Sequence, residues 1–245
     1  MLNTTIPIYV ISVKSFLDRH EHIERLAKSL DLQFEYVWAF DADDLTEDDF
    51  TVVSKSLCKK SASNVLKHMH AQALFLETGK EVGLVLEDDV ILFKSFLDGL
   101  RRTIDLAKDL PPGWLIFLGG ADSKIDSRFF ESKDLCLVER SLTTAEAYLI
   151  DRRGCELRAQ WLSNHIIDRQ ADHQLKLIDD EIGLRQYSVS KPLATQGSIT
   201  GLFSTSLDAS RSKHSALFLR FKYEYNRFRR QTLGRLLAAA KRAFS

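Results

Sequence analysis

Val82-Gly83-Leu84-Val85-Leu86-Glu87-Asp88-Asp89 is a short apolar run that ends in three consecutive carboxylates. A continuous apolar run of this length is typical of a strand covered on both faces, as in a sheet packed between two layers of helices. In open α/β sheets, ligands collect at the carboxyl ends of the strands. The stretch therefore predicts a buried strand with an acidic ligand site at its end.

Strands and helices are expected to alternate on both sides of this stretch. Apolar runs predict further strands over residues 6–13, 33–40, 114–118, 135–138 and 147–150. Helical spacing and capping signals predict helices over residues 15–30, 61–77, 95–108 and 151–161, the first capped by Ser15 and Asp18. This alternation predicts an α/β fold with a mainly parallel central sheet.

The bulk composition is that of an ordinary globular protein. The chain has 245 residues, of which 44% are hydrophobic and 28% charged, and this suits one large α/β domain with an added tail. The three cysteines (Cys58, Cys136 and Cys155) are far apart and form no C-x-x-C pair, so we expect reduced thiols. No stretch approaches the roughly 20 apolar residues that span a bilayer, and we expect a cytoplasmic protein.

Charge is unevenly distributed along the chain. Residues 211–245 hold ten Lys or Arg and one acidic residue, so residues 1–210 hold 24 basic and 33 acidic residues. We expect a body over 1–210 and a basic helical tail over 211–245.

In the tail, one helical face is shared by Leu217, Phe221, Tyr225 and Phe228. Basic amphipathic helices bind anionic membrane surfaces, and we expect residues 213–244 to contact the inner face of the cell membrane. The alternative is a helix packed on the body or on a partner chain. The acidic body opposes nucleic-acid binding.

The three consecutive carboxylates crowd like charges, and a divalent cation would offset the cost. Oxygen ligands suit Mg²⁺ or Mn²⁺. On an extended backbone Glu87 and Asp89 project to the same side, so both could reach one ion, whereas Asp88 points the other way unless the turn has begun. The alternative is a solvated strand end whose acids cap the next helix.

Several segments, in order, resemble glycosyltransferase family 25, the bacterial lipopolysaccharide and lipooligosaccharide transferases related to collagen galactosyltransferases. Leu84 to Ile91 resembles the family's metal-binding signature. The other similar segments are Ile8 to Ser12 with Arg19, Ala39 to Ala42, Asn64 to His68, Ala147 to Gly154, and Ala171 to His173.

The resemblance implies a GT-A type nucleotide-sugar-binding domain that transfers a sugar with inversion. The expected donor is a UDP-sugar, UDP-galactose by family habit, and the expected acceptor is a surface glycan or glycolipid. It implies Mn²⁺ or Mg²⁺ held by Glu87 and Asp89, with His214 as a further ligand. Asp172 is the expected catalytic base, at the start of a helix where a carboxylate is favoured, and Glu146 is the alternative base. The expected donor-side residues are Ser12, Arg19, Asp41, His68 and Asp88.

The chain departs from the family pattern at three places. Lys59 to Ser63 replaces a Gly-Glu-x-Gly-Cys motif, Glu146 stands where a histidine is common, and Gln196-Gly197 replaces a Gln-Asp pair. Two other functions stay open. A nucleotidyltransferase also uses paired carboxylates and a metal, and a membrane-peripheral binding protein could retain a decayed transferase fold.

Overall fold

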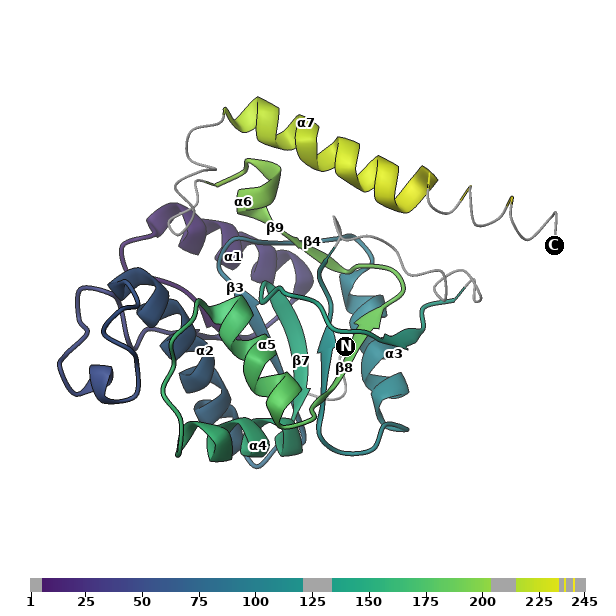
Figure 1. The fold of residues 1–245 in the computed structure, drawn as a ribbon. Coiled ribbons are helices and arrows are strands. Elements are labelled where there is room, and N and C mark those ends of the chain that lie inside the picture. Colours follow the sequence, from purple (N-terminus) through teal and green to yellow (C-terminus); the bar gives the residue numbers. More distant parts are fainter. Residues whose placement is uncertain (1–5, 121–133, 204–214, 234–235, 237–239, 241–245) are drawn as a thin grey trace.

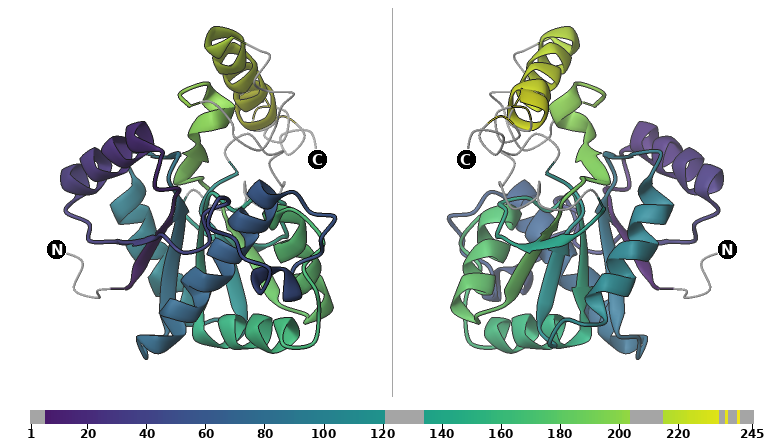
Figure 2. Two further views of the ribbon diagram at one scale, coloured as in Figure 1. Left: turned by 90° about the vertical axis from the view of Figure 1, so that its left-hand side faces the viewer. Right: turned by 90° about the vertical axis from the view of Figure 1, so that its right-hand side faces the viewer.

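The structure is a computed structural model, and it describes residues 6–120, 134–203, 215–233, 236 and 240. These residues form an α/β fold in three layers, with a central sheet between two layers of helices (Figures 1 and 2). No helix in the described part of the chain is long and apolar enough to cross a membrane.

The central sheet has seven strands, of which five run in the same direction. β3 pairs parallel with β1, and β1 with β2, whereas β7 is antiparallel to both β3 and β5. β8 is parallel to β5, and β6 is antiparallel to β8. The spatial order is β2 (Glu35–Val37), β1 (Ile8–Ile11), β3 (Val82–Glu87), β7 (Ala147–Asp151), β5 (Trp114–Phe117), β8 (Arg185–Val189) and β6 (Leu137–Glu139).

Alternate side chains of the strands enter two separate cores. Leu84 and Leu86 of β3 pack in the core beneath α1 (Leu17–Leu30) and α3 (Phe96–Ala107). Val85 packs in the opposite core, beneath α2 (Lys59–Glu77), α4 (Arg152–Leu162) and α5 (Ala171–Glu181). Because successive strand side chains point to opposite faces, Glu87 continues the Val85 side and faces α2. This alternation places Glu87 on the side of α2.

A second, two-stranded sheet lies against the acidic end of β3. It pairs β4 (Val90–Leu92) with β9 (Ala194–Gln196) in antiparallel register, and Val90 opposes Gln196. The short helix α6 (Gly197–Thr200) follows β9 directly. Residues about 110 positions apart in the sequence are thereby brought together.

The last described elements form a helix outside the three layers. α7 (Ala216–Arg227) is followed by the π-helical segment η4 (Phe228–Leu233), and a 3₁₀ turn, η1 (Asp49–Thr51), lies earlier in the chain. α7 packs against α6 near Gly201 and Ala216. Tyr223 is buried, and the Arg227 guanidinium lies over the Phe93 ring. α7 therefore contacts the body along one side (Figure 1).

The expected α/β fold with a mainly parallel sheet is confirmed. The predicted cap of the first helix is wrong, because α1 begins at Leu17 and its N-cap, Phe16, makes no side-chain cap bond. β8, β9 and α6 had no sequence prediction. The division at residue 210 and most of the second tail segment, residues 233–244, lie outside the described residues and stay predictions.

Candidate active site

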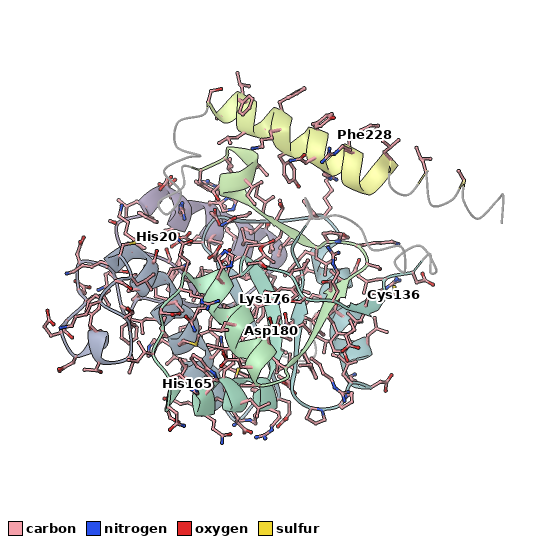
Figure 3. The ribbon with its side chains drawn as sticks, in the orientation of Figure 1. His20, Cys136, His165, Lys176, Asp180 and Phe228 are labelled. Atoms are coloured by element: carbon pink, nitrogen blue, oxygen red, sulfur yellow. The ribbon has the colours of Figure 1, made fainter. Side chains whose placement is uncertain are left out.

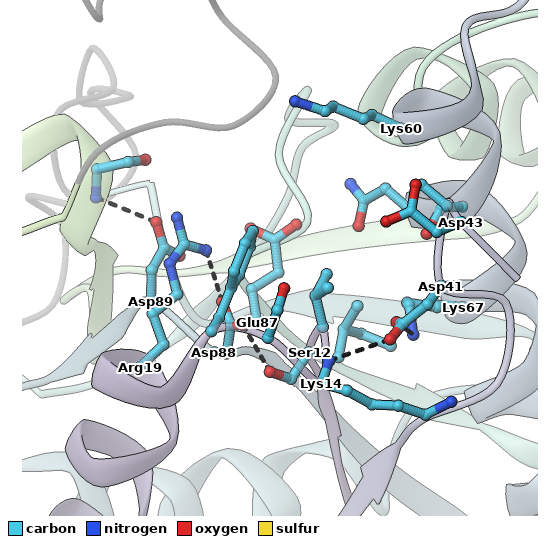
Figure 4. A pocket seen from close by; sticks show the side chains of 18 of the residues that line it. Ser12, Lys14, Arg19, Asp41, Asp43, Lys60, Lys67, Glu87, Asp88 and Asp89 are labelled. Atoms are coloured by element: carbon cyan, nitrogen blue, oxygen red, sulfur yellow. Dashed lines mark hydrogen bonds and ion pairs between the residues drawn. The ribbon is translucent and has the colours of Figure 1, made fainter.

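A pocket of about 590 Å³ opens at the carboxyl ends of β1 and β3. Its size is that of a typical small-molecule site. Figure 4 shows the acids at the end of β3 on one side of it and α2 on the other. Among the described residues that line it, the charged ones are Lys14, Arg19, Asp41, Asp43, Asp44, Lys60, Lys67, Glu87, Asp88 and Asp89. Six carboxylates thus face four cations, which leaves the pocket wall acidic.

Asp88 faces α1 and is fully paired with protein groups. The Ser12 hydroxyl donates to its Oδ2 at 2.7 Å, and Arg19 Nη1 donates to its Oδ1 at 2.7 Å. The turn begins at Asp88, so the strand alternation ends at Glu87. Asp88 therefore anchors the cluster to β1 and α1.

Glu87 faces α2 and is held by amide side chains. Gln196 Nε2 donates to its Oε2 at 3.2 Å, and the Asn64 side chain also hydrogen-bonds it. Burial, followed by the charge of Asp88, raises the pKa of Glu87 to about 7. A neighbouring cation would reverse this shift.

Asp89 is held by the start of α6. The Ser198 backbone N–H donates to its Oδ2 at 3.1 Å, and the Gly197 N–H donates to its main-chain oxygen at 2.7 Å. Its Oδ1 is buried and has no hydrogen-bond partner among the described residues. Burial, followed by the charge of Glu87, raises the pKa of Asp89 to about 7.

His68 lies behind Glu87, away from the pocket wall. It is fully buried, its Nδ1 lies 3.2 Å from the Tyr148 hydroxyl, and its Nε2 lies 3.5 Å from Glu87 Oε1. Burial lowers the pKa of His68 to about 4, so the ring is neutral at pH 7. A neutral imidazole ring therefore lies beside Glu87, and its Nε2 makes no hydrogen bond to a described residue.

Glu146 and Asp172 lie on the same inner side. The Gly120 N–H donates to Glu146 Oε1 at 2.8 Å, and burial raises the pKa of Glu146 to about 8. Asp172 lies in the first turn of α5, where burial and the charge of Glu87 raise its pKa. It lines a small cavity with Tyr148 and Arg158, separate from the large pocket.

Asp41 is held beside the pocket by a buried lysine. Lys67 Nζ lies 2.7 Å from Asp41 Oδ1 and donates to the carbonyls of Val37 and Ala39 at 3.1 and 2.7 Å. The Lys14 N–H donates to Asp41 Oδ2 at 3.1 Å. Lys67 thereby fixes the turn that follows β2.

The predicted site residues fall into three groups. Ser12, Arg19, Asp41, Glu87, Asp88 and Asp89 line one pocket, whereas His68, Glu146 and Asp172 lie behind Glu87. His214 lies outside the described residues. Within the described residues, no group of three or more His, Cys, Asp or Glu side chains is arranged to hold one metal ion.

A sequence model described as glycosyltransferase family 25 (LPS biosynthesis protein) matches residues 5–154. The match covers more than half of the chain, including the whole acidic cluster. The chain belongs to glycosyltransferase family 25. A search of curated proteins found no match.

Family membership confirms the predicted enzyme class. The family 25 domain makes the chain a glycosyltransferase, with a role in LPS biosynthesis by the family's description, and it favours glycosyl transfer over nucleotidyl transfer. A glycosyltransferase of this kind uses a nucleotide-sugar donor and a glycan acceptor. The match ends before Asp172, Gln196 and Ser198.

Sequence reasoning missed several residues of the pocket. Asn64 and Gln196 hold Glu87, and Ser198 holds Asp89 through its backbone. Polar side chains spaced three and four positions apart along residues 60–67 were a usable signal, because such residues share one helical face. The missed members of this face are Lys60, Ser63, Asn64 and Lys67.

Proposed function

We propose that this glycosyltransferase transfers a hexose from a UDP-sugar to a lipopolysaccharide or lipooligosaccharide acceptor with inversion. The family resemblance implies that the hexose is galactose. The observation that carries the proposal is the acidic end of β3 on the wall of a 590 Å³ pocket. A GT-A type organisation is part of the proposal, because the nucleotide would then bind at the carboxyl ends of β1 and β3.

A divalent cation is the second part of the proposal. Asp89 Oδ1 is buried without a hydrogen-bond partner in the described part of the chain, and the pKa values of Glu87 and Asp89 are both raised to about 7. Both observations fit a site that needs positive charge. Mg²⁺ is commonly bound by one or two carboxylates together with substrate phosphates, so a cluster of three ligands is not required.

Glu87 and Asp89 are the residues that would hold the ion, Mn²⁺ or Mg²⁺. When bound, it would stabilise the negative charge that develops on the departing diphosphate. Asp88 is already occupied by Ser12 and Arg19, so its role is to position the turn between Glu87 and Asp89. Arg19 places a fixed positive charge on the same pocket wall.

Asp172 remains the proposed base. The acceptor hydroxyl must lose its proton as it attacks, and a carboxylate within reach can take that proton. Asp172 belongs to the first turn of a helix, lines the small cavity behind Glu87, and interacts electrostatically with Glu87 and His68. This role requires the acceptor hydroxyl to reach that side of Glu87. Glu146 is less suited, because its raised pKa, about 8, keeps it protonated at pH 7 and makes it a hydrogen-bond donor.

The decisive experiment measures UDP release from UDP-sugars in the presence of Mn²⁺. The Asp89→Asn variant should lose at least about a hundredfold in turnover, as expected when transition-state electrostatics are removed, while keeping its thermal unfolding midpoint. Asp98→Asn, on the exposed side of α3, is the matched control and should keep full activity. Wild-type turnover in Asp89→Asn would overturn the metal assignment.

Contact with an anionic membrane is the third part of the proposal. The apolar face predicted for the tail points outward: Leu217, Phe221, Tyr225 and Phe228 are 81, 72, 54 and 56% exposed. Figure 3 shows side chains that project from α7 away from the body, with Phe228 near its end. Arg220, Lys222 and Arg229 flank this face and are exposed. Exposed apolar and basic side chains together suit an anionic lipid surface. The inner leaflet is the proposed location.

A further inference from the structure

One face of α2 lines the pocket opposite the acids. Lys60, Ser63, Asn64 and Lys67 follow a spacing of three and four positions, which places them on one side of the helix. Two of them have protein partners. Asn64 hydrogen-bonds Glu87, and Lys67 binds Asp41 and two backbone carbonyls. The other two face the pocket itself.

Ser63 is a polar residue of the pocket wall whose hydroxyl has no partner among the described residues. It is only 3% exposed and lines the pocket, yet its hydroxyl makes no hydrogen bond to any described residue. The hydroxyl oxygen is open to the pocket, where it can donate to an anionic oxygen of a ligand. A bound ligand is therefore the expected partner of Ser63.

Lys60 supplies a positive charge beside Ser63. In the described part of the chain it has no carboxylate within 4.0 Å, and its ammonium extends from α2 over the pocket in Figure 4. The first turn of α2 contains no acidic residue, so the positive end of the helix dipole is not offset there. These groups together favour an anion.

We propose that Lys60 and Ser63 bind a negatively charged oxygen group, a carboxylate or phosphate, that the substrate carries in addition to the donor diphosphate. The inference rests on the proposed function. In the proposed function the diphosphate binds at Glu87 and Asp89 through the divalent cation. Asn64 contacts Glu87, and Lys60 lies one helical turn, about 5.4 Å, before Asn64. The anion therefore belongs either to the transferred sugar, as in a hexuronic acid, or to a phosphorylated acceptor glycan.

The first arm of the test measures donor binding to the full chain by calorimetry with Mn²⁺ present. The ligands are UDP, UDP-galactose and UDP-galacturonate. If the donor carries the anion, the wild type should bind UDP-galacturonate about tenfold more tightly than UDP-galactose. Lys60→Gln should abolish this ratio, and Ser63→Ala should reduce it two- to threefold. Lys59→Gln, an exposed neighbour that does not line the pocket, should keep it.

The second arm uses lipooligosaccharide acceptor before and after phosphatase treatment. If the acceptor carries the anion, Lys60→Gln should raise the KM for the phosphorylated acceptor about tenfold and leave that for the dephosphorylated acceptor unchanged. Lys59→Gln should change neither KM.

The inference is supported if the wild type prefers the charged ligand in either arm and Lys60→Gln removes that preference. The arm in which this happens identifies whether the donor sugar or the acceptor carries the anion. No discrimination in both arms overturns it. Equal weakening of UDP and of both UDP-sugars by Lys60→Gln also overturns it, because Lys60 would then bind the diphosphate. Failure of the wild type to bind UDP with Mn²⁺ would overturn the proposed function itself, and the inference with it.

Discussion

Glu146 shows how strongly a single buried carboxyl group can depend on its surroundings. It is 4% exposed, its Oε1 accepts from the Gly120 N–H, and Gly119 packs directly against its carboxyl group. Burial raises its pKa from 4.5 to about 8. Between these values the folded chain keeps a proton that the unfolded chain releases. The stability of the metal-free protein should therefore fall as pH rises from 4.5 to 8.

Replacing Glu146 with glutamine tests this linkage. Glu146→Gln retains an oxygen for the Gly120 N–H but cannot ionise, so it should remove a pH dependence of up to about 1.4 kcal/mol per pH unit. Urea unfolding at pH 5, 6, 7 and 8 with a chelator present measures the slope. Glu77→Gln, exposed at the end of α2, should leave the slope unchanged. If the free energy of unfolding changes with pH in the same way for Glu146→Gln and the wild type, the raised pKa of Glu146 would be contradicted.

At this scale the sequence predicted the acids, together with Ser12 and Arg19, but not the residues that hold Glu87 and Asp89. Glu87, Asp88 and Asp89 are consecutive and follow an apolar run, which is a clear signal. Ser63 and Asn64 are single polar residues in a helix, and such residues are usually solvated surface. Only the packing of α2 against β1 and β3 places them on the pocket wall.

α6 is the element that connects the second sheet to the acidic cluster. Its first residue, Gly197, has no room for a side chain: a Cβ there would lie 2.5 Å from the Asp89 backbone oxygen and 2.8 Å from the Phe203 ring. Because backbone atoms cannot yield as a side chain does, a larger residue must move α6 away from Asp89.

Gly197→Ala should therefore weaken both the fold and the site. We expect a loss of about 1–3 kcal/mol in the free energy of unfolding, as for other overpacked positions, and about tenfold weaker binding of UDP with Mn²⁺, since the Ser198 N–H bond to Asp89 is lost. Thr200→Ala, on the same helix, removes only a hydrogen bond to the Gly197 carbonyl and is the control. Urea unfolding and calorimetry measure the two effects, and wild-type UDP affinity in Gly197→Ala would rule out the coupling.

Elements with an apolar pattern were predictable, and polar ones were not. β1, β3 and β5 are continuous apolar runs, whereas β8 reads Arg185-Gln186-Tyr187-Ser188-Val189 and buries Gln186 and Ser188. These polar residues lie inside because neighbouring strands pair with β8 on both sides. Hydrophobic alternation therefore misses such a strand.

The whole molecule combines an acidic body with a basic tail. The net charge is zero, but residues 211–245 carry nearly a third of all Lys and Arg. α7 packs on the body through Tyr223 and presents its apolar face outward. If that face binds lipid, the body would be held at the membrane surface by the tail.

Vesicle binding tests this orientation. The protein should cosediment with vesicles containing anionic phospholipid but not with purely zwitterionic vesicles, and the binding should weaken with added salt. The double variant Leu217→Ser with Phe221→Ser should reduce binding at least tenfold, because each exposed apolar side chain contributes about 1.5–3 kcal/mol when buried. Leu106→Ser, an exposed apolar residue on α3, is the control. Undiminished binding of the double variant would favour purely electrostatic adsorption.

The reversed direction of β7 determines which loops border the acidic cluster. In an all-parallel sheet, only the loops that follow strands reach the ligand edge. Because β7 runs against β3, the residues before it reach that edge instead, and the Glu87 N–H donates to the Glu146 carbonyl at 3.0 Å. A loop that enters a strand and a loop that leaves one therefore share the same rim. The hydrogen-bonded ladder between β3 and β7 is made by backbone groups, so it does not depend on the side chains of either loop.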